Sequence, residues 1–345
     1  MRITALAGGV GGARFLRGLL AAVPEAAVTV IGNVGDDMTM HGLRICPDLD
    51  TVMYTLGGGI HEGQGWGRVD ETFGVADELK AYGVGPDWFT LGDKDIATHL
   101  VRSQMLGAGY PLSAVTEALC TRWELPVRLL PSTDERVETH VVVDDPEAPG
   151  GRRAVHFQEY WVRMHAPEAR SIVSVGVEGA KPAPGVLEAI AEADVIVLPP
   201  SNPVVSIGTI LDIPGIRQAV ADAPAPVVGL SPIVGGGPVR GMADKVLAAV
   251  GVKVSAAAVA EYYGSELLDG WLVDADADAA AVADVEAAGI ACRAVPLMMS
   301  SPEATRAMAQ AALDLAAEIS AAKNSAAQNS AAQISAAQIS ATNDR

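Results

Sequence analysis

A glycine-rich loop stands near the start of the chain. Residues 6–15 read LAGGVGGARF, after a short run at 2–6 that is typical of a strand. Glycine is used where the chain takes a positive φ or where a ligand approaches the main chain closely. Residues 14–23 then have helical spacing. Because a strand, a glycine loop and a helix present backbone N–H groups to an anion, we predict phosphate binding here. A tight turn that binds nothing is the alternative.

This loop departs from both common phosphate-binding patterns. No Lys-Ser or Lys-Thr pair follows it, so it is not a P-loop. If the dinucleotide pattern G-x-G-x-x-G starts at Gly9 and Gly11, its third position falls on Arg14. A guanidinium group can reach a phosphate, which a closing glycine cannot do.

Carboxylates follow the next predicted strand, AVTVI. The segment GNVGDDMTMHG contains Asn33, Asp36 and Asp37, and CPDLDTVMYTLGGG brings Asp48 and Asp50. Mg²⁺ prefers oxygen ligands and bridges phosphates, so these acidic loops favour a magnesium site. Helix N-caps and Asx turns are the alternative for each aspartate taken alone.

Two later loops also follow apolar runs. PPSNPVVSIGTIL contributes Asn202 and Ser206, whose amide and hydroxyl groups suit a phosphate or the edge of a guanine. SPIVGGGPVRG is a second glycine loop, with Arg240 available. Since the protein is anionic overall, polar and glycine-rich loops after several strands indicate a nucleotide ligand.

The segment LGDKDIATHLVR contains further polar side chains. Lys94 can pair with an oxyanion of a ligand or balance its acidic neighbours. His99 stands four residues after Asp95, the spacing of an ordinary helix pair. Trp66, in GWG, can form part of a flat slot for an aromatic ring, although burial in a core is the alternative.

The elements that position these loops alternate between strands and helices. Helical stretches occur at 185–193 and 215–223, and the apolar runs read as buried parallel strands are 27–31, 171–175, 194–198 and 226–230. Such alternation predicts an α/β fold with a doubly wound, mainly parallel, Rossmann-like sheet. Ligands of these sheets bind beyond the carboxyl ends of the strands, where the loops above meet.

The rest of the chain divides by pattern. We expect residues 1–65 and 136–318 to form a nucleotide- and metal-binding domain, with 66–135 as a helical insertion or cap. The segments 139–145 and 152–162 are predicted to pair and rejoin the sheet. From residue 319 a five-residue unit rich in Ala, Ser and Gln repeats, and we expect 319–345 to be a disordered or frayed tail.

Composition limits the partners and the location. The formal charge is −18, which disfavours nucleic acid and anionic membranes. Three scattered cysteines indicate neither a zinc site nor a disulfide framework. Arg14 and Arg17 interrupt any signal-like apolar run, and no segment approaches the length of a membrane span. We therefore expect a cytoplasmic enzyme without a membrane partner, and a homodimer as the commonest assembly.

Taken together, these motifs resemble one enzyme family. The chain is similar to the 2-phospho-L-lactate transferases (CofD-like), and more narrowly to the actinobacterial phosphoenolpyruvate transferases. The resemblance runs from Met1 to about Leu315. Its motifs, in order, are GGVGGARF, NVGDD, CPDLDTVMYTLGGG, GWG, LGDKDIATHLVR, STDERVETH, HFQEYWVR, PSNPVVSIGTIL, SPIVGGGPVRGMADK and AVPLMMSSPEAT.

The resemblance implies a role in making coenzyme F-420. Such enzymes move a phosphoenolpyruvyl or 2-phospho-L-lactyl group from a guanosine diphosphate diester to the hydroxyl of the deazaflavin precursor Fo, and release GMP. The sequence leaves both donors open, and the actinobacterial likeness favours enolpyruvate. Phosphoryl transfer depends mainly on positioning and charge neutralisation, which suits Mg²⁺ as the cofactor.

The resemblance also implies site residues. Asp36 and Asp50 would hold the metal, and Asp50 would also stand near the Fo hydroxyl as a candidate base. Lys94 and Trp66 would contact Fo. The residues for the phosphates and the guanosine would be Gly9, Gly11, Gly12, Arg14, Asn33, Asn202 and Ser206.

Two other functions compete with this one. A nicotinamide-dependent oxidoreductase would share the early glycine loop and an acid after the second strand. Arg14 in place of the third glycine and the Asp-rich second loop count against it. A guanine-nucleotide-binding module without catalysis would bind GDP and show no turnover with Fo.

Overall fold

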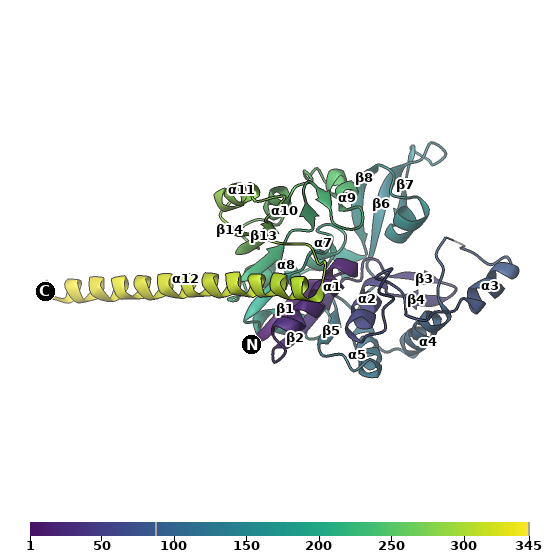
Figure 1. Ribbon diagram of the computed structural model, residues 1–345, viewed down its shortest axis with the longest axis horizontal. Helices are drawn as coiled ribbons and strands as arrows, with labels where there is room; N and C mark the ends of the chain where they lie inside the picture. The colour runs from purple at the N-terminus through teal and green to yellow at the C-terminus, as the bar shows by residue number, and fades with distance from the viewer. Residues whose placement is uncertain (87, 344–345) are drawn as a thin grey trace.

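A parallel sheet forms the centre of the computed structural model, which describes residues 1–86 and 88–343. In these residues the sheet has the order β14-β13-β10-β9-β1-β2-β5, and every pairing is parallel (Figure 1). Its strands are β1 (Arg2–Ala7), β2 (Ala27–Gly32), β5 (Arg128–Pro131), β9 (Val195–Leu198), β10 (Val227–Leu230), β13 (Gly270–Asp274) and β14 (Ala291–Val295). The predicted α/β doubly wound fold is confirmed.

The order of the strands reverses at β1. From β1 the chain first builds outward through β2 to β5, and later returns to add β9 on the other side of β1. In open α/β sheets, ligands bind at such a reversal, outside the carboxyl ends of the strands. The loops after β1, β2 and β9 are therefore the ones that meet at the candidate site.

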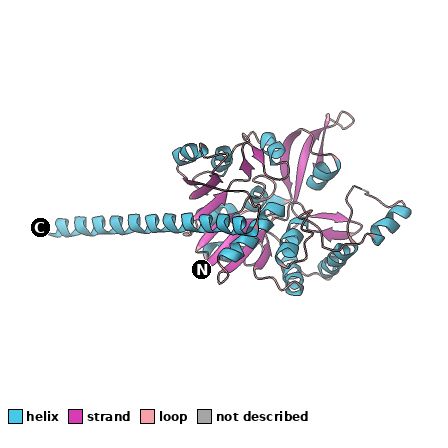
Figure 2. Cartoon of the chain, viewed as in Figure 1, coloured by secondary structure: helices cyan, strands magenta, loops and turns pink. Residues whose placement is uncertain are grey.

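Helices cover both faces of the sheet (Figure 2). The helices are α1 (Gly9–Ala22), α2 (Pro47–Leu56), α3 (Gly74–Ala81), α4 (Asp93–Gly107), α5 (Leu112–Arg122), α6 (Val186–Ala191), α7 (Ile207–Asp212), α8 (Ile216–Ala221), α9 (Ala243–Ala249), α10 (Ala256–Tyr263), α11 (Ala281–Ala287) and α12 (Pro302–Asn343). Two short helical turns, Glu159–Arg163 and Val177–Gly179, complete them.

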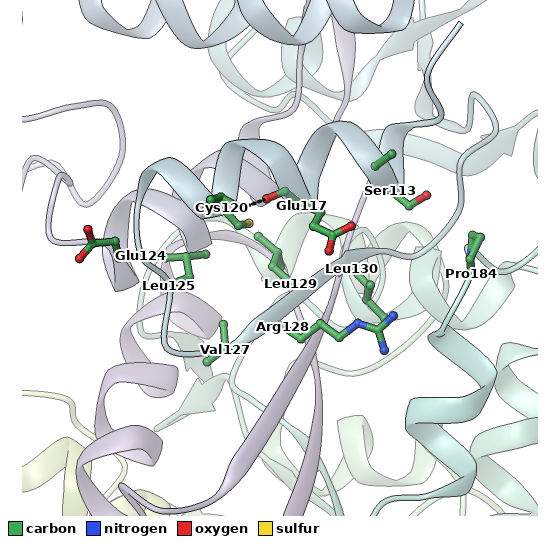
Figure 3. Close-up of a pocket in the computed structure, with 12 residues that line it drawn as sticks. Ser113, Glu117, Cys120, Glu124, Leu125, Val127, Arg128, Leu129, Leu130 and Pro184 are labelled. Carbon is green, nitrogen blue, oxygen red and sulfur yellow. Dashed lines mark hydrogen bonds between the residues drawn. The ribbon is translucent and has the colours of Figure 1, made fainter.

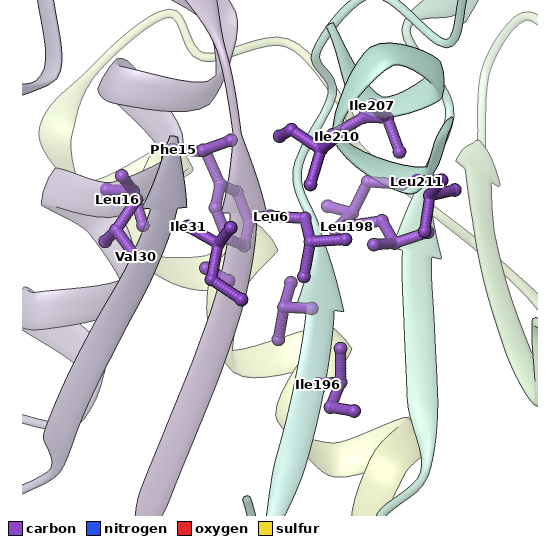
Figure 4. Close-up of a cluster of buried hydrophobic side chains, with 14 of the residues drawn as sticks. Leu6, Phe15, Leu16, Val30, Ile31, Ile196, Leu198, Ile207, Ile210 and Leu211 are labelled. Carbon is purple, nitrogen blue, oxygen red and sulfur yellow. The ribbon is translucent and has the colours of Figure 1, made fainter. Parts of the chain in front are cut away.

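The core lies on both sides of the central strands. Leu6 and Ile31 pair across β1 and β2, with Phe15 of α1 packed near them. On the β9 side, Ile210 and Leu211 of α7 pack near Leu198, as Figure 4 shows. A sheet covered on both faces needs continuous apolar strands rather than alternating ones. This is why AVTVI and DVIVL could be recognised from sequence.

Three small antiparallel sheets stand outside the central one. They are β3–β4 (Met38–Met40, Leu43–Ile45), β11–β12 (Ile233–Val234, Gly237–Pro238), and the three-stranded sheet β7-β6-β8 (Arg152–His156, Glu138–Asp144, Ala169–Val175). The segments 139–145 and 152–162 do pair, as expected, but they do not rejoin the central sheet. Burial alternates along β6 between buried and half-buried residues, so only one face of this strand is fully covered.

Two strand predictions need correction. Residues 171–175 were expected in the parallel sheet, yet β8 pairs antiparallel with β6. Its burial is patchy along the strand, unlike that of a strand covered on both faces. Within the expected helical insertion, 128–131 forms β5, the edge strand of the central sheet. The helices α3 to α5 do occupy the rest of 66–135, and the domain bounds stay a prediction.

The C-terminal repeats follow directly on a packed helix. The first turns of α12 lie against α1, and Met308, Leu313 and Ala316 are buried. Beyond residue 318 the same helix runs on as far as Asn343, away from the rest of the fold (Figure 1). We expected disorder there, because no apolar face emerges from the repeats. Alanine and glutamine are good helix formers, which explains how a helix already started can continue through them. None of the helices in the described ranges has the length and apolar character that crossing a membrane demands.

Candidate active site

The glycine loop packs against the other loops at this end of the sheet. Helix α1 begins at Gly9, directly after β1. A Cβ at Gly11 would lie 2.5 Å from the backbone oxygen of Pro200, and one at Gly12 would lie 2.5 Å from Ser201 Oγ. These glycines therefore let the first turn of α1 touch the loop after β9. The first N–H groups of a helix have no partner within it, and Gly9 donates its N–H to Asp48.

Asp36 and Asp48 form a buried carboxylate pair. Asn33 Nδ2 donates to Asp48 Oδ2 (2.9 Å) and to Asp36 Oδ1 (3.2 Å). Gln158, from the segment after β7, donates to Asp36 Oδ2 at 3.0 Å. The side chains of this cluster thus come from three separate parts of the chain.

The hydrogen-bond donors to the Asp36–Asp48 pair among the described residues are all neutral amide groups. Burial, followed by the charge of Asp48, raises the pKa of Asp36 well above its usual value. Burial raises the pKa of Asp48 to about 6, although hydrogen bonds from Asn33 and Gly9 act in the opposite direction. A neighbouring cation would remove this penalty, because it would compensate the charge that burial disfavours.

Asp37 belongs to a neighbouring group. Its Oδ2 accepts from Arg44 Nη2 at 3.1 Å, and its Oδ1 has no hydrogen-bond partner in the described part of the chain. Burial raises the pKa of Asp37 to about 7, despite the opposing charge of Arg44. His156 Nε2 contacts the backbone oxygen of Asp37 at 3.2 Å, so the three-stranded sheet β7-β6-β8 contacts the acidic loop.

Asp50 lies in a second cluster, with residues of α4. Its Oδ1 accepts a hydrogen bond from Arg102 Nη2, and its Oδ2 lies 3.7 Å from His99 Nδ1. His99 Nε2 in turn lies 3.5 Å from Asp95 Oδ2, and Tyr54 donates to Asp95 Oδ1 at 2.6 Å. The spacing of Asp95 and His99 therefore does give the expected helix pair, and α4 brings that pair to Asp50.

This second cluster has the ligand spacing of a metal site. One ligand atom from each of Asp50, Asp95 and His99 lies within 4.8 Å of the others. Asp50 Oδ2 and His99 Nε2 are buried without a hydrogen-bond partner among the described residues. Arg102, however, already supplies a positive charge to Asp50, which the Asp36–Asp48 pair lacks.

The predicted Fo-contacting residues come from two segments that hydrogen bonds join. Lys94, in the first turn of α4, donates from Nζ to the backbone oxygen of Val69 at 3.0 Å. Arg68 donates to the backbone oxygen of Lys94 at 2.9 Å. Trp66 stands just before and is 54% exposed, so its ring is not a core residue. The structure thus brings the segment that carries Trp66 to the start of α4.

The residues predicted for guanosine have structural partners. The side-chain oxygen of Asn202 accepts from the backbone N–H groups of Val204 (3.0 Å) and Val205 (3.1 Å). Ser206 is buried beside the glycine loop, where a Cβ at Gly8 would lie 2.8 Å from its own Cβ. Both residues shape the loop after β9.

Sequence patterns missed several members of these clusters. Asp48 was noted as an acid but not assigned, although its place two residues before Asp50 in the first turn of α2 was a signal. Arg102 stands in the motif LGDKDIATHLVR, but its helical spacing from His99 does not predict its contact with Asp50. Gln158 stands in the motif HFQEYWVR, but the sequence does not show that it meets Asp36, because it follows β7 of a separate sheet.

A separate hollow lies at the edge of the sheet (Figure 3). It measures about 520 Å³ and lies between α5 and β5, with Glu117, Leu125, Arg128 and Leu130 among its lining residues. No predicted site residue lines it. We therefore place the candidate active site at the acidic loops rather than here.

Comparison with known proteins agrees with the resemblance. Residues 3–299 match the family model described as 2-phospho-L-lactate transferase CofD. The chain belongs to the CofD family. A protein of Streptomyces griseus named phosphoenolpyruvate transferase is 72% identical over 320 residues, which cover 92% of this chain and 99% of that protein. Proteins with the same name from Nocardia farcinica and Mycolicibacterium smegmatis are each 56% identical, over 91% and 92% of this chain and 95% and 99% of theirs.

A solved structure shares the fold. Protein BH3568 from Bacillus halodurans superposes with a TM-score of 0.60 at 17% identity, over 90% of this chain and 99% of that one. This likeness concerns the architecture alone. The family match confirms the prediction of a transferase enzyme and goes against a nicotinamide-dependent oxidoreductase.

Proposed function

We propose that this chain transfers a phosphoenolpyruvyl group from a guanosine diphosphate diester to the hydroxyl of Fo, in coenzyme F-420 biosynthesis. The observation that carries the proposal is the 72% identity, over almost the full length of both chains, to a protein named phosphoenolpyruvate transferase. A 2-phospho-L-lactyl donor is the alternative, since the family model bears that name. The products would be the phosphodiester-linked deazaflavin and GMP.

Mg²⁺ is the proposed cofactor, and the acidic clusters fit it. Asp36 and Asp50 were the expected ligands, and we now add Asp48 as the partner of Asp36. The raised pKa values of Asp36 and Asp48 support a cation beside them, because amide groups alone do not neutralise two carboxylates. Asp50 would contribute through the neighbouring group with Asp95 and His99. When bound, the ion would neutralise the diphosphate charge during transfer.

The transfer itself requires an in-line arrangement of the reacting groups. The Fo hydroxyl oxygen forms a bond to the phosphorus that bears the enolpyruvyl group, while the bond from that phosphorus to the bridging oxygen breaks and GMP leaves. The hydroxyl proton needs an acceptor. We propose Asp50, since Arg102 holds its Oδ1 while Oδ2 has no hydrogen-bond partner among the described residues.

The remaining predicted site residues are proposed as binding groups. Lys94 and Trp66 would contact Fo. The groups for the phosphates and the guanosine would be Gly9, Gly11, Gly12, Arg14, Asn33, Asn202 and Ser206. The convergence of their loops at the reversal of strand order supports this assignment. Asn202 and Asn33 would act mainly by shaping loops, because both side chains already have protein partners.

The cellular setting is proposed from charge and composition. A net charge of −18 supports small-molecule substrates rather than nucleic acid or a membrane surface. We also propose a cytoplasmic location and a homodimer, for which size-exclusion chromatography with light scattering is the direct test.

A mass-spectrometric assay tests the function. The full chain is incubated with Fo, Mg²⁺ and either the enolpyruvyl or the lactyl donor, and the deazaflavin product and GMP are measured. We expect the enolpyruvyl donor to be used at the higher rate. If neither donor gives a phosphodiester-linked deazaflavin, the proposed function is wrong.

The same assay tests the role of Asp50. Asp50→Asn keeps the size of the side chain and removes its negative charge, so we expect a rate loss of about 10²-fold or more. Asp284→Asn, on exposed α11, is the matched control. An Asp50→Asn variant with the full rate would leave the family assignment intact and remove Asp50 from the mechanism.

A further inference from the structure

Arg14 and Arg240 bring their guanidinium groups to the same short loop. Arg14 Nη2 donates to the backbone oxygen of Glu62 at 3.4 Å, and Arg240 Nη2 donates to that of Gln64. A Cβ at Gly65 would lie 3.2 Å from Arg240 Nη1 and 3.6 Å from Arg14 Nη2. The two positive groups are therefore neighbours, although 226 positions separate them in the sequence.

Neither group forms an ion pair in the described part of the chain. Glu62, whose backbone receives Arg14, directs its carboxylate to Arg17 at 2.8 Å. Burial and the positive charge of Arg14 lower the pKa of Arg240 from its usual value. Two adjacent guanidinium groups without a direct ion pair repel each other, and an anion between them would reverse this.

The loop of residues 62–65, whose backbone accepts a hydrogen bond from each arginine, contacts the start of α1. A Cβ at Gly65 would lie 2.7 Å from Val10 Cγ1, and Val10 belongs to the first turn of that helix. The first turn of α1 contains no acidic residue. The N-terminal end of a helix carries a partial positive charge, which adds to that of the arginines.

We propose that Arg240 is a diphosphate-binding residue that acts together with Arg14. The proposal rests on the proposed function, because a guanosine diphosphate diester carries one negative charge on each of its two phosphates. Each guanidinium has five N–H donors and gives one hydrogen bond to the loop, so donors remain for phosphate oxygens. Arg240 reaches the site from the loop after β12, which follows β10 of the central sheet.

Calorimetric titration of the full chain tests this assignment. The ligands are GDP, inorganic pyrophosphate and guanosine, each with Mg²⁺ present, and the variants are Arg240→Gln, Arg240→Lys and Arg14→Gln. We expect Arg240→Gln to weaken GDP and pyrophosphate binding about tenfold, the typical value for one charge-assisted hydrogen bond, and to leave guanosine binding unchanged. Binding should also depend less steeply on salt.

A matched control comes from α8. Arg217 is exposed and forms no ion pair among the described residues, so Arg217→Gln removes one positive charge elsewhere. Arg240 is also exposed, and we expect both variants to keep the wild-type melting temperature. Should Arg240→Gln fold poorly, Arg240→Lys decides the matter, because it keeps the charge and loses the fork of donors. It should bind pyrophosphate more weakly than the wild type.

The outcomes separate this proposal from the proposed function. If Arg240→Gln and Arg240→Lys bind pyrophosphate as tightly as the wild type, the inference is wrong, whatever the enzyme transfers. In the other case, the wild type uses neither donor in the turnover assay, while pyrophosphate binding falls in the Arg240 and Arg14 variants and not in Arg217→Gln. That result would support the anion site and show that the proposed function is wrong.

Discussion

Asp36 and Asp48 accept hydrogen bonds from the same nitrogen atom, Asn33 Nδ2, at 3.2 and 2.9 Å. Two buried carboxylates that share one neutral donor repel each other. This relationship joins the loop after β2 to the start of α2.

Magnesium binding should strengthen as the pH rises from about 5 to 7. The raised pKa of Asp48, about 6, means that protons compete with the cation below that pH. The measurement is the Mg²⁺-dependent shift in melting temperature at pH 5.5 and 7.5, which is expected to be larger at pH 7.5. Asp48→Asn should abolish most of the shift at both pH values. A shift in Asp48→Asn equal to that of the wild type would remove Asp48 from the site.

Stability without metal should fall as the pH rises through the same range. Asp37 has an ordinary pKa of 3.8 when unfolded and about 7 when folded, so the folded state binds more protons between these values. The stability that protonated Asp37 provides is present at low pH and is lost by about pH 7. Urea unfolding in EDTA at pH 5 and pH 8 measures this slope. Asp37→Asn should reduce it, and Asp284→Asn should leave it unchanged.

Removal of Arg102 should destabilise the fold strongly. It is buried against Asp50, and removing one partner of a buried ion pair leaves an uncompensated charge. We expect Arg102→Met to cost about 3–5 kcal/mol of the free energy of unfolding. Asp50→Asn combined with Arg102→Met should cost less than the sum of the two single changes. Strict additivity in this double-mutant cycle would show that the pair is not coupled.

The glycines of the first loop should prove necessary for packing. A Cβ at Gly11 would meet the backbone oxygen of Pro200, which cannot move aside without shifting the loop after β9. We expect Gly11→Ala to destabilise the protein by about 1–3 kcal/mol. Gly107→Ala in α4 is the control, since a Cβ there meets nothing within 4 Å. Alanine should stabilise that position by up to about 1 kcal/mol. A Gly11→Ala variant as stable as the wild type would contradict the close contact.

The parallel strands were predictable because each is a short apolar run covered on both faces. AVTVI and DVIVL became β2 and β9 for this reason. The prediction for 171–175 was wrong because Val and Ile in the half-exposed antiparallel strand β8 resemble those of a buried parallel one. The edge strand β5 lay inside a helical region, where four residues give little signal.

Residue types along the chain were enough to predict the loops that we propose for the chemistry: a glycine loop, two acidic segments and a polar turn, each after a strand. Local residue types suffice for this prediction, because the end of a strand and the type of turn that follows depend on residues adjacent in the sequence. The grouping of the carboxylates was not predictable in this way, because it depends on contacts between elements that are distant in the sequence. Asp36 lies with Asp48 and Gln158, whereas Asp50 pairs with Arg102. Asp48 and Asp50 are two positions apart on α2 and therefore do not share a face of the helix, and α4 packs beside Asp50. The meeting of Arg14 with Arg240 likewise depends on contacts between helix α1, the loop at Gly65 and the loop after β12.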